Sequence, residues 1–107
     1  MLVHGRKIGE VLDGVSRPQF DADEIRTLAL LHLIQIIGEA ASRTTQPLRA
    51  RHPEIPWARI IGMRHRVVHG YETVDLDVVW DTATKDVPIL TEAVETIVRV
   101  EFPEWAE

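Results

Sequence analysis

The sequence predicts a single domain built only from α-helices. Its apolar residues recur at the three- and four-residue spacing of amphipathic helices, and no segment shows the alternation of a half-buried strand. A length of 107 residues fits one domain, and 45% hydrophobic with 27% charged residues is an ordinary globular balance. We therefore expect one all-α domain of four or five helices over residues 1–107. The core of so small a domain is thin, which favours burial of one face against a partner.

The first half of the chain predicts two helices joined by a polar turn. Residues 2–12 form a short helix, and Ser16-Arg17-Pro18 form the turn. The second helix spans residues 24–42, with Asp21 or Asp23 as its cap. Its apolar residues cover so much of its circumference that we expect it to be buried on more than one side.

The middle of the chain predicts a short helical piece, a connector and a third helix. The short piece spans residues 48–52, and residues 53–56 are extended because a proline stands at each end. The third helix runs from residue 57 to about His69, and Gly70 is a natural stop just past its end.

The last third predicts two more helices. The first spans residues 76–84, and Lys85-Asp86 forms a break. Pro88 suits the first turn of the final helix, which runs to about Val100.

Charge is unevenly distributed along the chain. The net charge is −5, yet the stretch from Arg43 to His69 carries six arginines against one acidic residue, Glu54. Such a segment can be an electrostatic footprint for nucleic acid or only a solvated polar face, and charge alone does not separate the two. The arginines are Arg43, Arg49, Arg51, Arg59, Arg64 and Arg66.

The composition also limits the cellular location of the protein and the kinds of cross-link and metal site that it can form. There is no cysteine, which excludes disulfides and thiolate metal sites. No apolar run approaches the roughly 18 residues that span a bilayer, and the start lacks the apolar stretch of a signal peptide. We expect a cytoplasmic protein with no membrane association.

Arg64 and His69 are the residues that carry chemistry. Arg64 lies seven residues after Trp57 and four after Ile60, in the middle of an apolar stripe. A guanidinium there forms a buried ion pair, extends to solvent or faces a wet interface. Arginine suits a phosphate whose charge grows in the transition state, and histidine moves protons near neutral pH. Together they are sufficient for metal-free RNA cleavage through the 2′-hydroxyl.

The spacing of these two residues bears on how a site could form. Five residues within one helix separate Arg64 and His69 by about 140°. One copy alone would not close around a phosphate, whereas two copies packed along this stripe could.

A metal site is the rival interpretation of the same segment. His65 and His69 are four residues apart, the spacing of a metal pair, but no third ligand is apparent and no carboxylate lies between them. We therefore expect no metal and no cofactor, and a role for His65 in orienting a phosphate or a neighbouring side chain. Tyr71 is the only tyrosine; packing is its ordinary role, although a phenol beside the Arg–His pair could be exposed.

At these residues the chain resembles the HepT toxins of the HEPN superfamily. Arg64, His69 and Tyr71 match the family pattern R-x4-H-x-Y. The likeness covers roughly residues 14–100. Its other matching segments are Ile36-Ile37-Gly38-Glu39-Ala40-Ala41, Pro53-Glu54-Ile55-Pro56-Trp57, Ile61-Gly62-Met63-Arg64, Val74-Asp75-Leu76 and Val79-Trp80.

The resemblance implies an antiparallel helical bundle of the HEPN type that dimerises through the catalytic helix. It implies that Arg64 and His69 carry metal-independent endoribonuclease activity in a composite dimer site, with His65 and Arg66 supporting RNA binding. It also implies a type VII toxin–antitoxin system, in which a minimal nucleotidyltransferase antitoxin of the MntA type transfers AMP onto Tyr71. The first helix is shorter than the family's, so we expect it to be truncated.

Two other functions remain open from the sequence. The chain could be a catalytically silent HEPN module that binds a nucleotidyltransferase partner or a nucleotide. It could also be a structural dimerisation protein in which Arg64 forms a buried ion pair.

Overall fold

The structure, a computed structural model, describes residues 1–68, 75–102 and 104, and for residues 63–68 it describes the backbone only. Within these residues every regular element is helical. In chain order the elements are α1 (Leu2–Leu12), α2 (Arg17–Asp21), α3 (Glu24–Ser42), α4 (Gln46–Arg51), α5 (Trp57–Val68), α6 (Leu76–Asp81), the π-helical segment η1 (Thr82–Asp86) and α7 (Val87–Glu101). The expected all-α bundle is confirmed.

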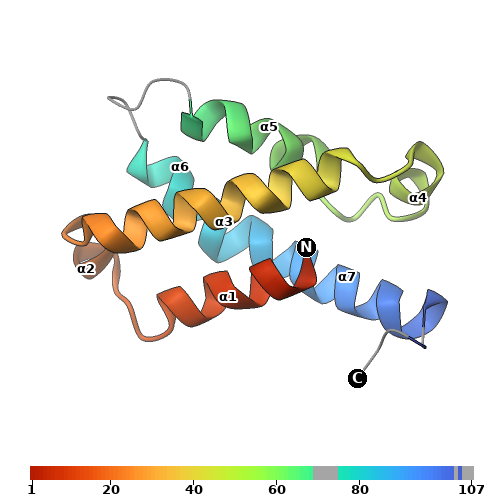
Figure 1. The fold of residues 1–107 in the computed structure, drawn as a ribbon, viewed down its shortest axis with the longest axis horizontal. Helices are drawn as coiled ribbons and strands as arrows, with labels where there is room; N and C mark the ends of the chain where they lie inside the picture. Colours follow the sequence, from red (N-terminus) through yellow and green to blue (C-terminus); the bar gives the residue numbers. More distant parts are fainter. Residues whose placement is uncertain (69–74, 103, 105–107) are drawn as a thin grey trace.

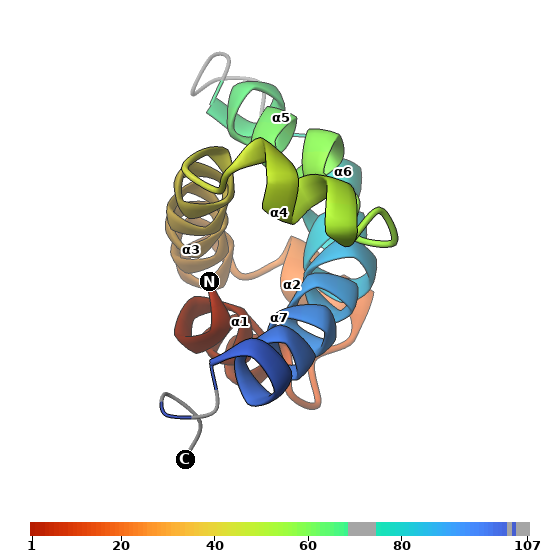
Figure 2. The same ribbon diagram turned by 90° about the vertical axis from the view of Figure 1, so that its right-hand side faces the viewer.

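Helix α3 is the longest of the described helices and runs along the bundle (Figure 1). It packs against α1 on one side and α5 on the other, with α2 and α6 near its first half. The continuous helical run α6–η1–α7 closes the bundle, because α7 lies along α1 while α6 and η1 contact α5. Seen along the long axis, α3, α5, α6, α7 and α1 surround one central core (Figure 2).

Helix α3 is buried less widely than its apolar circumference predicts, because its buried residues follow one face at three- and four-residue spacing while Ile25 and Leu28 are exposed. Asp23 is its N-cap: the carboxylate accepts the amide of Arg26 at 2.9 Å and pairs with the Arg26 guanidinium at 2.6 Å. The same guanidinium donates to the carbonyl of Val11 at 2.9 Å, which ties the start of α3 to the end of α1. The buried residues of α3 are Thr27, Leu30, Ile34, Ile37, Gly38 and Ala41.

The expectation that no segment has the length and composition of a membrane span is wrong for α3. Among the described helices it alone meets that test, with 19 residues and a mean hydropathy of 1.2. The apolar core helix of a helical bundle has the same composition. Here Leu30, Ile34 and Ile37 are fully buried among other helices, so packing within the bundle accounts for their hydropathy.

The turn expected at Ser16-Arg17-Pro18 is instead the start of helix α2. The hydroxyl of Ser16 accepts the amide of Gln19 at 3.4 Å, and the Gln19 side chain accepts the amide of Ser16 at 2.9 Å. This reciprocal capping box satisfies two amides that a helix start leaves free. The short helix then buries Phe20 completely, with its ring 5.2 Å from that of Trp80.

The break expected at Lys85-Asp86 is a π-helical turn within one continuous helix. The amide of Val87 donates to the carbonyl of Thr82, five residues earlier. Pro88 has no amide to donate and its ring crowds the preceding turn, so a widened turn lets the helix continue where an α-helical turn would kink. The buried face consequently runs on through Val79, Ala83, Val87, Leu90 and Val94.

A glycine allows α1 and α7 to approach closely. A Cβ placed on Gly5 would lie 2.2 Å from the Thr91 hydroxyl oxygen and 3.3 Å from the Thr91 Cβ. That hydroxyl is buried and is the one buried side-chain polar atom without a hydrogen-bond partner among the described residues. Gly9, one turn later on α1, has nothing within 4 Å of such a Cβ.

These two glycines make a matched pair for a stability measurement. We expect Gly9→Ala to raise the free energy of unfolding by up to about 1 kcal/mol, because alanine favours the helix and meets no neighbour. We expect Gly5→Ala to lower it by about 1–3 kcal/mol through the clash with Thr91, and Thr91→Ala to restore much of that loss. Urea unfolding of the four proteins checks this, and equal effects at the two glycines would contradict the close approach.

The cap of α3 predicts a dependence of stability on pH. The Arg26 amide, followed by the Arg26 side chain, holds the pKa of Asp23 below its ordinary value of 3.8. Because the folded pKa is the lower one, the charge contributes fully above pH 3.8 and is lost as pH falls through the folded value. The stability advantage of the parent over Asp23→Asn should therefore shrink below this pH. Urea unfolding across the acidic range measures it, and an advantage that grows on acidification contradicts the assignment.

Candidate functional site

The motif residues lie at the C-terminal end of α5 and beyond it. Arg64, His65 and Arg66 belong to α5, although their side chains are outside the described part of the structure. His69 and Tyr71 lie outside the described residues altogether, in the six-residue interval between the end of α5 and the cap of α6. The structure therefore places the backbone of three of the five expected site residues and leaves the side-chain geometry of the site untested.

The start of α5 is firmly held in the bundle. The carbonyl of Pro56 accepts the amide of Ile60 at 3.0 Å, and the Trp57 indole donates to the carbonyl of His52 at 3.0 Å. Ile55, Trp57 and Ile60 are buried, which seats this end of the helix in the core. Rigid support of this kind is what a site at the other end of the helix needs.

An ion pair joins α5 to the π-helical turn. The Arg59 Nε lies 3.0 Å from the Asp86 Oδ2, and the Asp86 side chain is only 10% exposed. The sequence predicts a break at Lys85-Asp86 and not this pair. The signal was present, because Asp86 stands seven residues after Val79 and four before Leu90, on the buried stripe of one helix. A carboxylate in such a position needs a partner.

The start of α6 is anchored as well. The Asp75 carboxylate accepts the amides of Asp77 and Val78 at 3.0 and 3.3 Å. Arg17 bridges Asp21 and Asp77 at 2.8 and 2.6 Å, and these carboxylates, Asp21 foremost, raise the pKa of its guanidinium. The boundary of the undescribed interval at the start of α6 is thus tied to α2 through Arg17 and Asp77.

Four of the six arginines in the basic segment form hydrogen bonds or ion pairs within the fold. Arg49 donates to the carbonyls of Ala41 and Ser42 at 3.3 and 2.9 Å, and so caps the C-terminal end of α3. Three other arginines pair with carboxylates: Arg43 with Glu39, Arg51 with Glu101 and Arg59 with Asp86. The charge pattern by itself therefore overstates the surface that these four arginines offer to RNA.

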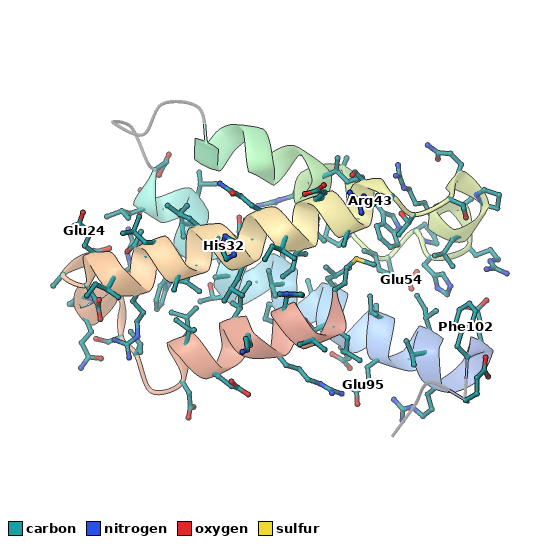
Figure 3. The ribbon with its side chains drawn as sticks, viewed as in Figure 1. Glu24, His32, Arg43, Glu54, Glu95 and Phe102 are labelled. Carbon is teal, nitrogen blue, oxygen red and sulfur yellow. The ribbon has the colours of Figure 1, made fainter. Side chains whose placement is uncertain are left out.

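Two polar residues of α3, His32 and Glu39, lie at the surface of the bundle. His32 is exposed on the outer surface of the helix, and Glu39 is exposed and pairs with Arg43 at 2.9 Å (Figure 3). Neither lines the cavity beside α7 or the one between α1 and α7.

A cavity lined by described residues lies away from the C-terminal end of α5 (Figure 1). It has a volume of about 520 Å³ and lies between the segment Arg51–Glu54 and the outer face of α7. That region and the C-terminal end of α5 are at opposite ends of the long axis (Figure 1). No group of three His, Asp or Glu side chains within the described residues is arranged to hold a metal ion.

An all-α bundle with R-x4-H-x-Y on and after its third long helix defines a HEPN-type domain. The chain belongs to the family described as ribonuclease HepT-like, whose model matches residues 1–97. This interval contains every residue of the motif.

Individual relatives agree with the family assignment. A protein of Caldanaerobacter subterraneus subsp. tengcongensis, named provisionally as an RNase, is 34% identical over 92 residues, which are 86% of this chain and 82% of that protein. The "Probable ribonuclease HepT" of Thermococcus cleftensis is 37% identical over 71 residues, 66% of this chain and 64% of that protein. A third relative, from Methanocaldococcus jannaschii and again provisionally an RNase, is 32% identical over 71 residues, 66% of this chain and 61% of its own length. No solved structure matches the chain.

Proposed function

We propose that this chain is the toxin ribonuclease of a toxin–antitoxin system, an endoribonuclease whose cleavage is carried by Arg64 and His69. The observation that carries the proposal is membership of the HepT-like ribonuclease family across an interval that contains both residues. The fold supports it, because α5 brings Arg64 to the end of a helix whose start is buried and hydrogen-bonded.

The chemistry follows from the two side chains. His69 takes the proton of a ribose 2′-hydroxyl, and the freed oxygen attacks the adjacent phosphorus. The bond from phosphorus to the 5′-oxygen breaks, and an imidazolium returns a proton to that oxygen. The products are a 2′,3′-cyclic phosphate and a 5′-hydroxyl. Arg64 stabilises the charge that grows on the phosphate, so the reaction needs no metal ion.

The site is completed by a second copy of the chain. Five residues of helix turn Arg64 and His69 about 140° apart, so neither copy alone surrounds a phosphate. Two chains packed along α5 bring two motifs to one cleft, in which one His69 acts as base and the other as acid. His65 and Arg66 contact the RNA backbone beside it, which fits the finding that Arg43, Arg49, Arg51 and Arg59 already have partners.

Tyr71 is the regulated residue in this proposal. A nucleotidyltransferase antitoxin transfers AMP from ATP onto its phenol oxygen, with pyrophosphate as the leaving group, in a type VII system. The added phosphate brings negative charge and bulk next to the Arg–His pair, where it repels an RNA backbone. The protein acts in the cytoplasm, where its RNA substrate and ATP are present.

Cleavage of RNA by the purified chain tests the catalytic proposal. We expect Arg64→Ala and His69→Ala to slow cleavage at least about 100-fold while EDTA leaves the parent unchanged. Arg43→Ala and His32→Ala, exposed residues of the same types on the surface of α3, serve as matched controls and should keep the parent rate. Circular dichroism confirms that each variant is folded.

Other results would favour the other two functions. A folded parent that cleaves no faster than His69→Ala contradicts the ribonuclease proposal and supports a silent module that binds a nucleotidyltransferase or a nucleotide. Loss of folding in Arg64→Ala alone, by about 3–5 kcal/mol, would point to a buried ion pair at that residue.

Modification of Tyr71 is tested by co-expression with a nucleotidyltransferase of the same operon. We expect the intact mass to increase by one AMP group or more, with cleavage lost in proportion to the modified fraction. Tyr71→Phe should stay unmodified, cleave RNA at the parent rate and escape neutralisation. Modification that persists in Tyr71→Phe would contradict the assignment of this residue.

A further inference from the structure

We propose that Asp86 is a positioning residue, which orients the motif helix α5 through its ion pair with Arg59. The proposal deepens the ribonuclease function and rests on it only for the catalytic consequence. It assigns a purpose to a charged residue that lies in the protein interior, outside the motif and on a different helix.

Burial of the Asp86 carboxylate costs free energy at this position. It is 7% exposed and is the only acidic residue among the buried polar residues of the described chain, the others being Thr27 and Thr82. Removing a carboxylate from water costs free energy that an ion pair only partly offsets, so an apolar residue of similar size would serve stability at least as well. Its presence is therefore better explained by geometry than by stability.

The π-helical turn directs Asp86 toward α5. The turn holds one more residue than an α-helical turn, and its hydrogen bond runs from the Val87 amide to the Thr82 carbonyl. Both Asp86 and Val87 consequently lie on the buried side of the helix. Turns of this kind often occur at functional sites, where they redirect a side chain.

The pair adds a directional contact to the Trp57 hydrogen bond at the start of α5, because the other described side chains that seat this helix in the core are apolar. Trp57 and Ile60 are buried and seat the helix in the core, but apolar contacts are non-directional and permit small rotations. The planar guanidinium of Arg59 has fixed donor directions, and its Nε lies 3.0 Å from the Asp86 Oδ2. The pair therefore sets both the rotation of α5 about its axis and its position along that axis.

An error in that rotation is transmitted directly to the motif. Arg64 follows Arg59 by five residues on the same helix, a rise of about 7.5 Å. Because an α-helix is stiff over this length, a rotation at Arg59 turns Arg64 by the same angle. A displacement of about 1 Å in a catalytic group can reduce a rate by about 100-fold.

The test compares Asp86→Asn with Asp81→Asn. Asp81 forms an exposed pair with Lys85 at 3.4 Å, one turn earlier in the same helical run, so the control removes the same charge without breaking the ion pair between Asp86 and Arg59. We expect Asp86→Asn to lower kcat for RNA by roughly ten-fold or more, with KM changed less than about two-fold. Asp81→Asn should change neither, at a temperature where both proteins are folded.

A second measurement is independent of activity. The chain has no cysteine, so spin labels can be placed at Ala58→Cys on α5 and Thr96→Cys on α7, both exposed residues. We expect Asp86→Asn to shift or broaden the distribution of distances between the labels, and Asp81→Asn to leave it as in the parent. If Asp86→Asn does not fold, Arg59→Lys is measured instead, because it keeps the charge but loses the planar geometry, and the same change is expected.

The outcomes separate the two proposals. An unchanged distance distribution overturns the positioning role, and so does a changed distribution with an unchanged kcat. If the labelled parent cleaves RNA no faster than Arg64→Ala, the ribonuclease proposal fails, while the label distances still decide whether Asp86 orients α5.

Discussion

The stability of this fold depends on burial of the apolar surface of α3 by neighbouring helices. This helix is apolar round most of its circumference, so it is stable in water only when other helices bury it. Helices α1 and α5 cover its two long sides, and α2 and α6 cover its first half. Polar caps fix its ends, with Asp23 at the start and the Arg49 guanidinium on the last carbonyls. The place of every other long helix follows from its contact with α3 or with a helix that contacts α3.

The same constraint explains why the motif is on α5. Helix α5 is one of the two covers of α3 and lies at the edge of the bundle, where one side packs inward and another is open. A buried start gives rigidity, and an edge position gives access to a large substrate. An enclosed pocket would suit a small ligand, whereas RNA needs an open surface. The 520 Å³ cavity lies at the far end of the molecule from the C-terminal end of α5 (Figure 1), which is consistent with separate places for a small ligand and for RNA.

Charges that look alike in the sequence have different roles in the fold. Arg43 pairs on the surface, Arg49 caps a helix, and Arg59 reaches a buried carboxylate. Local charge density therefore predicts an RNA surface poorly, because arginine is also the residue that best satisfies carbonyls and carboxylates within a protein. In the proposed function, RNA binding is assigned to the arginines near the end of α5, which lie close to the motif in the sequence.

The sequence by itself determined the helical class, the bounds of α1 and α3, and the family motif, because each follows from spacing along the chain. It misjudged Ser16, where a capping box starts a short helix, and Lys85-Asp86, where a widened turn lets a helix continue. Only the tertiary structure decided the partners of the arginines and the burial of Asp86. Those contacts join residues as much as 60 positions apart, as in the pair of Arg17 with Asp77. Such contacts exist only after packing on α3 has brought the helices together.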